Sequence, residues 1–185
     1  MTTVPTATAP TATAAAHTMA PIRATAPDDP AAQLRWLVDR AAISDILVEF
    51  ARSLDERDFS ANTALYLPDG VFMIGDTVAL AGHEQLARTG SPAGLGRYAG
   101  TWHLSANHAI EIDGDTARTR SYLLGVHLLG GDTFRHADGG GWYDCTLRRT
   151  PQGWRFATVR VREVWHAGEP LPHVRDVGPQ PPATR

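Results

Sequence analysis

The chain has 185 residues and a formal net charge of −3, which suits one domain and gives no indication of a nucleic-acid partner. All 17 basic residues are arginines, and the absence of lysine excludes Schiff-base chemistry, which needs a lysine amine. Cys145 is the only cysteine, so the chain can form neither an internal disulfide nor a CxxC metal site.

The two ends of the chain are low in large apolar side chains. Of the first 30 residues, 22 are Thr, Ala or Pro, which cannot bury enough surface to offset the entropy of ordering. We therefore predict a disordered tail over residues 1–31, a folded domain over 32–167 and a flexible tail over 168–185. The first tail lacks the features of a secretory signal, so we expect a cytoplasmic protein, with Met19 as an alternative initiator. No apolar run approaches a membrane span, so we expect no membrane partner.

Helical periodicity starts at Leu34 and continues to Asp55. Its apolar stripe recurs at three- and four-residue intervals and comprises Ile43, Ile46, Leu47, Phe50 and Leu54. Asp55 lies at the border of this stripe, where a carboxylate can face a cavity. Asp58 is expected to cap a second helix over residues 59–66, which ends before Pro68.

Shorter elements follow. Turn residues at 69–70 and 75–76 predict two short strands, over 71–74 and 78–80. A third helix is expected over residues 83–88. The glycine-rich residues 90–100 are predicted to form a loop that covers a cavity.

Residues 101–127 are predicted to be two long strands joined at Asp113-Gly114, a dipeptide that favours a two-residue hairpin loop. In this hairpin His103 and His127 lie close to opposite one another. His108 is five residues from His103, and in a regular strand this spacing sends the two side chains to opposite faces, so we expect no zinc site. Residues 128–141 are predicted as a connection, followed by strands over 142–149 and 154–165.

This order of elements predicts an α+β domain, because helices precede a run of strands. Specifically, we expect three N-terminal helices packed on a strongly curved, mainly antiparallel sheet. A curved sheet that is closed on one side by helices forms a cone with an interior.

Three stretches carry a family resemblance: DRAAISDILVEFARSLDERDFSANTALYLPDGVFMIG, HxxxNHxIEIDGDTARTRSY and WYDCTLRRTPQGWRF. The chain resembles the SnoaL-like branch of the nuclear transport factor 2 (NTF2-like) superfamily over about residues 33–166. The resemblance implies a cone-shaped fold, a homodimer formed through the outer sheet face, and no cofactor. It does not fix the activity, because the fold hosts dehydratases, isomerases, polyketide and other aldol-type cyclases, epoxide hydrolases and non-catalytic subunits.

The resemblance also implies site residues. Scytalone dehydratase and bile acid dehydratase use an aspartate at the end of the first helix and a histidine on the strand after the third helix, which correspond to Asp55 and His103. His127 approximately matches a second polar position. A last-strand arginine of bile acid dehydratase corresponds to Arg160 or Arg162.

The candidate catalytic residues are therefore Asp55, His103 and His127, since a carboxylate fixes the tautomer of an imidazole and raises its basicity. The candidate substrate-binding residues are the large side chains expected in the cone and two arginines: Phe50, Phe72, Met73, Tyr122, Trp142, Arg160 and Arg162. Each residue also has a non-functional interpretation. Asp55 can be a solvated residue near a helix end, and His103 a hydrogen-bonded strand histidine without a catalytic role. The two arginines can form an exposed basic edge, and the large apolar side chains can be ordinary core. We expect no metal site.

Two functions fit these observations. The first is a cofactor-free dehydratase, isomerase or aldol-type cyclase of secondary metabolism that acts on a small apolar carbonyl compound. In it, His103 takes a proton next to the carbonyl, and His127 or an arginine stabilises the oxyanion. The second is a non-catalytic ligand-binding or structural subunit, like the small subunits of ring-hydroxylating dioxygenases, which predicts a filled interior or a separated Asp55 and His103.

Overall fold

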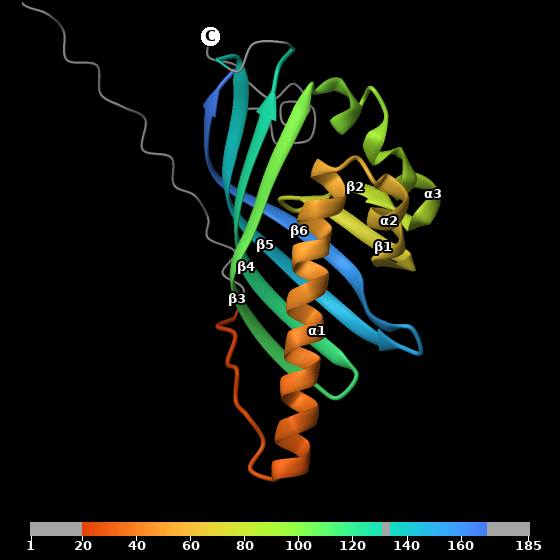
Figure 1. Cartoon of the computed structure of the whole chain (residues 1–185), viewed down its shortest axis with the longest axis vertical. Helices are drawn as coiled ribbons and strands as arrows, with labels where there is room; N and C mark the ends of the chain where they lie inside the picture. Colours follow the sequence, from red (N-terminus) through yellow and green to blue (C-terminus); the bar gives the residue numbers. More distant parts are fainter. Residues whose placement is uncertain (1–19, 131–133, 170–185) are drawn as a thin grey trace, which may run out of the picture.

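The computed structural model describes residues 20–130 and 134–169 and contains a six-stranded sheet with helices packed against it (Figure 1). The elements are α1 (Pro30–Asp55), α2 (Phe59–Ala64), β1 (Tyr66–Ile74), β2 (Thr77–Ala81), α3 (Gly82–Leu86), two short 3-10 turns (Ala87–Gly90 and Leu95–Arg97), β3 (Gly100–Asp113), β4 (Thr116–Leu128), β5 (His136–Thr150) and β6 (Gly153–Gly168). The mixed α+β class is therefore confirmed. Most of the two predicted tails lies outside the described residues.

The strands are ordered β2-β1-β6-β5-β4-β3. Every neighbouring pair is antiparallel except β1 and β6, which are parallel. The long strands β3 to β6 curl behind α1, while α2, α3, β1 and β2 gather around the C-terminal end of that helix (Figure 1). Phe50 and Leu54, near the C-terminal end of α1, are among the residues that line a cavity.

Helix α1 is fixed at its start by Asp29, whose side chain accepts a hydrogen bond of 2.8 Å from the Ala32 amide, and by Pro30 in the first turn. Its buried face is the predicted apolar stripe. The aromatic ring of Phe50 packs edge-to-face on the rings of Tyr143 and Phe156. This packing holds the last turn of α1, and with it Asp55, over the sheet.

Several predicted boundaries are wrong. Residues 65–66 do not continue α2, because Tyr66 already pairs with β6, and Pro68 lies in β1 where the pairing is irregular, a position that tolerates a missing amide hydrogen. The third helix follows two strands, as predicted, but α3 covers Gly82–Leu86 and ends two residues before the predicted boundary. The hairpin loop is Gly114-Asp115, with Asp113 paired to Thr116.

The glycine-rich connection predicted over residues 128–141 is also shorter than expected. Strand β4 continues to Leu128, and β5 begins at His136. Gly140 and Gly141 are strand residues that make room for neighbours: a Cβ on Gly140 would lie 2.4 Å from the Trp165 ring, and one on Gly141 would lie 1.9 Å from the Arg162 carbonyl oxygen. These two glycines therefore mark close packing within β5 and do not mark a loop.

Among the described residues, none of the helices combines the length and the apolar character that a membrane crossing requires.

Candidate active site

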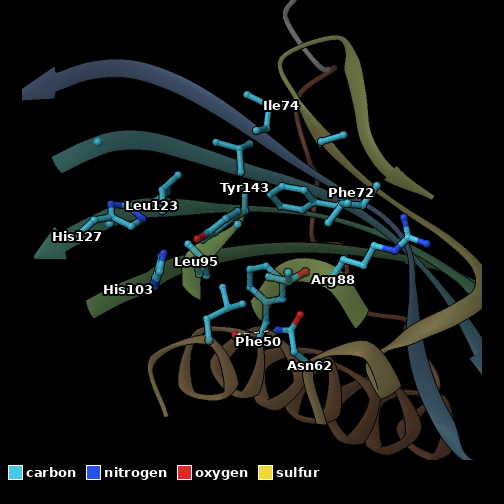
Figure 2. A pocket seen from close by; sticks show the side chains of 18 of the residues that line it. Phe50, Asn62, Phe72, Ile74, Arg88, Leu95, His103, Leu123, His127 and Tyr143 are labelled. Atoms are coloured by element: carbon cyan, nitrogen blue, oxygen red, sulfur yellow. Dashed lines mark hydrogen bonds between the residues drawn. The ribbon is translucent and has the colours of Figure 1, made fainter. Parts of the chain in front are cut away.

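A cavity of about 500 Å³ lies between α1, the inner face of β3 to β6 and the segment after α3 (Figure 2). Its wall is mainly aliphatic and aromatic, and the few polar groups include His103, His127, Tyr143 and Glu163. In Figure 2 the two histidines lie together at one end, Arg88 lies at the opposite end, and aromatic rings stand between them. The size and lining are those of a small-molecule site.

Asp55 and His103 form a closely bonded pair at the histidine end. The Asp55 Oδ1 atom lies 2.6 Å from the His103 Nδ1 atom, and Asp55 Oδ2 accepts a 2.7 Å hydrogen bond from the His103 backbone amide. Thr101 donates its hydroxyl hydrogen to Oδ1 at 3.0 Å. These two side chains are 48 residues apart in sequence, so the fold brings together the two residues that the sequence paired.

The three hydrogen bonds decide the charge of Asp55. Burial by itself opposes ionisation, but the hydrogen bonds from the side chain and backbone of His103 and from Thr101 outweigh it, so the pKa of Asp55 lies below its ordinary value. The resulting carboxylate favours the imidazole tautomer that carries its proton on Nδ1. The Nε2 atom of His103 then has a free lone pair beside Gly125, another residue of the cavity wall.

His127 lies beside this pair. Its ring centre is 5.2 Å from that of His103, with the rings nearly perpendicular, and its other face packs on the Tyr98 ring at 4.8 Å. The register places His127 opposite Thr101, and His103 opposite Gly125, so the two histidines are diagonal neighbours. The Nδ1 atom of His127 donates a 2.9 Å hydrogen bond to the Ala137 carbonyl oxygen. The Nε2 atom therefore lies on the opposite side of the ring from this backbone contact.

Tyr143 is a site residue that sequence reasoning missed. Its side chain projects from β5 into the cavity, and the hydroxyl is turned toward the histidine end (Figure 2). Burial, helped by the nearby Cys145 and Asp55, raises the pKa of Tyr143 well above its ordinary value, so the phenol keeps its proton. Within residues 20–130 and 134–169 this hydroxyl has no hydrogen-bond partner, which leaves it available to a bound molecule.

His108 was predicted to face away from His103, and this prediction is wrong. A bulge between Ala106 and Ala109, with Asn107 at a left-handed φ of 55°, adds one residue to β3 and returns His108 to the inner face. Its Nδ1 atom lies 2.8 Å from the Ser44 hydroxyl, and its Nε2 atom lies 3.2 Å from the Ser105 hydroxyl. His108 is not among the cavity-lining residues, so its place is in the packing of α1 on the sheet.

Of the seven predicted substrate-binding residues, Phe50 and Phe72 line the cavity, and five do not: Met73, Tyr122, Trp142, Arg160 and Arg162. The five lie on the outer sheet face, because their strand neighbours Phe72, Leu123, Tyr143 and Val161 face inward and side chains alternate. Arg160 contacts Met73 and Asp76, Arg162 contacts Asp144, and Arg120 covers the Trp142 ring. Neither arginine can therefore stabilise an oxyanion in the cavity.

In the described part of the chain, no group of three or more His, Cys, Asp and Glu side chains is arranged to hold a metal ion. The polar groups of the cavity are instead spaced for proton transfer and hydrogen bonding. An anchored base, a protonated phenol and a second imidazole around an apolar space can remove a proton from a carbon atom and hold the oxygen on which charge develops.

The chain belongs to the SnoaL-like domain family, whose model matches residues 35–160, and thereby to the NTF2-like superfamily. Its relatives include the uncharacterized protein Rv2910c of Mycobacterium tuberculosis (strain ATCC 25618 / H37Rv). That protein is 28% identical over 118 residues, which are 64% of this chain and 80% of the relative.

Solved structures with the same fold include two of particular interest. A candidate scytalone dehydratase from Novosphingobium aromaticivorans superposes with a TM-score of 0.65 at 21% identity, over 73% of this chain and 90% of the other. The hexachlorocyclohexane dehydrochlorinase LinA-type3 from Novosphingobium barchaimii superposes with a TM-score of 0.64 at 18% identity, over 72% and 92%. At these identities the likeness establishes the fold and leaves the activity to the site.

Proposed function

We propose that the protein is a cofactor-free lyase or isomerase that removes a proton from carbon in a small apolar molecule. The observation that carries the proposal is the 2.6 Å contact between Asp55 and His103 with His103 on the wall of an apolar cavity. His103 is 7% exposed and Asp55 20% exposed, so the pair operates largely out of water, where electrostatic stabilisation is strongest.

In the first step, the Nε2 atom of His103 takes a proton from the carbon next to a carbonyl group. The carbon–hydrogen bond breaks, its electron pair forms the carbon–carbon double bond of an enolate, and the charge moves to the carbonyl oxygen. The imidazolium that forms is stabilised by the Asp55 carboxylate. The Tyr143 hydroxyl is positioned in the cavity to donate a hydrogen bond to the enolate oxygen.

The second step differs between the reactions of this class. In an isomerisation, the His103 imidazolium returns its proton to another carbon. In a dehydration, the enolate re-forms the carbonyl and expels a hydroxyl group, which leaves as water with a proton from the His103 imidazolium or from protonated His127. Both routes balance without an oxidant, a reductant or a further reactant.

The non-catalytic alternative is a subunit that binds a ligand or supports a partner. It predicted a filled interior or a separated Asp55 and His103, and neither feature is found. The remaining form of this alternative is a pure ligand-binding protein, which would hold an apolar ketone without exchanging its protons.

The test uses two reactions that report a positioned base. One is solvent deuterium exchange at the α-carbon of apolar ketones such as 1-tetralone, followed by NMR. The other is the ring opening of 5-nitrobenzisoxazole, followed by absorbance. We expect His103→Ala to lower both rates by about 100-fold or more. The control His136→Ala, on a histidine outside the cavity wall, should leave both rates unchanged. Equal rates for wild type and His103→Ala would reject the proposal.

A further inference from the structure

Glu163 is a carboxylate on the wall of an otherwise mainly apolar cavity. It lies on β6 and faces Gly141 of β5, and its side chain is 27% exposed. The residue as a whole is solvent-exposed, so its carboxylate can meet both water and a molecule in the cavity. The partners of Glu163 therefore indicate whether it serves the fold or a ligand.

The two carboxylate oxygens of Glu163 have different surroundings. Oε1 lies 3.2 Å from the Nδ1 atom of His166, a side chain that is 66% exposed. Oε2 lies over Gly139, 3.6 Å from the position that a Cβ would take there. Among the described residues, none forms a hydrogen bond with Oε2. The neighbouring arginine, Arg162, is on the outer face and bonded to Asp144.

The other acid of the site, Asp55, is not among the residues that line the cavity. Both of its oxygens already accept hydrogen bonds, from Thr101 and from the side chain and backbone of His103. Glu163 is therefore the cavity-lining carboxylate with an oxygen that accepts no hydrogen bond from the described residues.

Two glycines form the floor between His103 and Glu163. Gly125 and Gly139 face each other on β4 and β5, and both line the cavity. The Cδ2 atom of His103 is 3.3 Å from the Cβ position of Gly125, and Glu163 Oε2 is 3.6 Å from that of Gly139. Opposed Cβ positions lie about 5 Å apart, so the imidazole and the carboxylate are at most about 12 Å apart. A molecule of up to about two fused rings can therefore lie between the two groups.

We propose that Glu163 accepts a hydrogen bond from a hydroxyl group of the bound molecule, so that the cavity selects an uncharged, hydroxyl-bearing ring compound and rejects a carboxylate at that position. The placement of the reacting carbon at His103 rests on the proposed function, whereas the hydroxyl contact does not. A hydroxyl group suits the oxygen that is left, because a single donor is enough for Oε2 while His166 already contacts Oε1. An anionic group would meet Glu163 without a facing arginine.

The test compares three matched ketones: 6-hydroxy-1-tetralone, 1-tetralone and the corresponding tetralone 6-carboxylate. Dissociation constants are measured by calorimetry with the full chain. We expect the hydroxyketone to bind about tenfold or more tightly than 1-tetralone, since a hydrogen bond to a charged acceptor gives at least this difference. The carboxylate should bind most weakly. Glu163→Leu should abolish the preference for the hydroxyl group.

The control is Glu111→Gln, which changes a strand glutamate that is paired with Arg118 outside the cavity wall. It should keep the tenfold preference. His103→Ala should keep it too while losing deuterium exchange, which separates the hydroxyl contact from the proposed chemistry. If exchange proves independent of His103 while the preference depends on Glu163, the proposed function fails and this inference stands. An absent preference, a preference that survives Glu163→Leu, or no binding of any of the three ketones overturns the inference.

Thermal unfolding provides a second measurement that needs no ligand. If Glu163 serves mainly to hold His166, then Glu163→Leu and His166→Ala should lower the melting temperature alike, and the inference is overturned. If Glu163 is reserved for a ligand, Glu163→Leu should leave the melting temperature unchanged or raise it, because the contact with the largely exposed His166 contributes little to stability and a leucine adds apolar surface to the wall.

Discussion

The Asp144 cluster on the outer sheet face and the cavity use charged residues in different ways. In the cluster, the buried Asp144 is held by Arg120 at 2.6 and 2.7 Å and by Arg162 at 2.9 Å. At the cavity, Asp55 and Glu163 are paired with histidines instead, His103 and His166. An arginine stays protonated throughout the physiological range, whereas an imidazole gains and loses a proton. The Asp144 pairs therefore suit stability, and the cavity pairs suit proton transfer and ligand binding.

The largest effect should come from the Asp144 cluster. Asp144→Ala leaves two guanidinium groups without their shared partner in a largely buried place, and we expect it to lower the free energy of unfolding by about 3 kcal/mol. Urea denaturation measures this change. Asp76→Ala removes an exposed partner of Arg160 and should cost less than about 1 kcal/mol. Equal losses from both variants would show that burial does not set the strength of these pairs.

The pair of Asp55 and His103 should affect turnover more than stability. Asp55→Asn keeps the side-chain shape but removes the charge that stabilises the imidazolium, and we expect ketone deuterium exchange to fall by about 100-fold. The matched outer-face variant Arg160→Ala should stay within about twofold of wild type, because Arg160 is not on the cavity wall. A loss of exchange in Arg160→Ala would contradict the division between the outer sheet face and the cavity.

The smallest effect concerns His108, which lies on the inner face outside the cavity. Burial lowers the pKa of His108, and a hydrogen bond with the backbone of Ser105 offsets this only in part. The folded protein therefore resists protonation of this ring, while the unfolded chain takes up the proton below about pH 6.5, so the free energy of unfolding should decrease as pH falls through this value. His108→Gln should reduce that decrease, as measured by urea denaturation at pH 7.5 and pH 5. An identical pH dependence in both proteins would show that His108 titrates alike in the folded and unfolded states.

Sequence patterns placed some side chains on the face of the sheet that lines the cavity and others on the wrong face, for a common reason. The alternation of side chains correctly indicated that Arg160 and Arg162 share a face, but it could not say which face is inside. Apolar character did not decide the question either, because the outer face also carries large side chains such as Trp102 and Tyr122, which are 52% and 56% exposed. Tyr143 and Glu163 were missed because they alternate with the residues that were chosen.

The sequence by itself determined the α1 stripe and the long hairpin, since these depend on local periodicity within single segments. Its motifs also carried the family resemblance, which implied Asp55 and His103 as site residues. Only the tertiary structure decided the strand faces, the bulge that turns His108 inward and the glycine floor between His103 and Glu163. These features depend on how β3 to β6 register and curl against α1. Such packing joins residues far apart in the chain, and no local pattern encodes it.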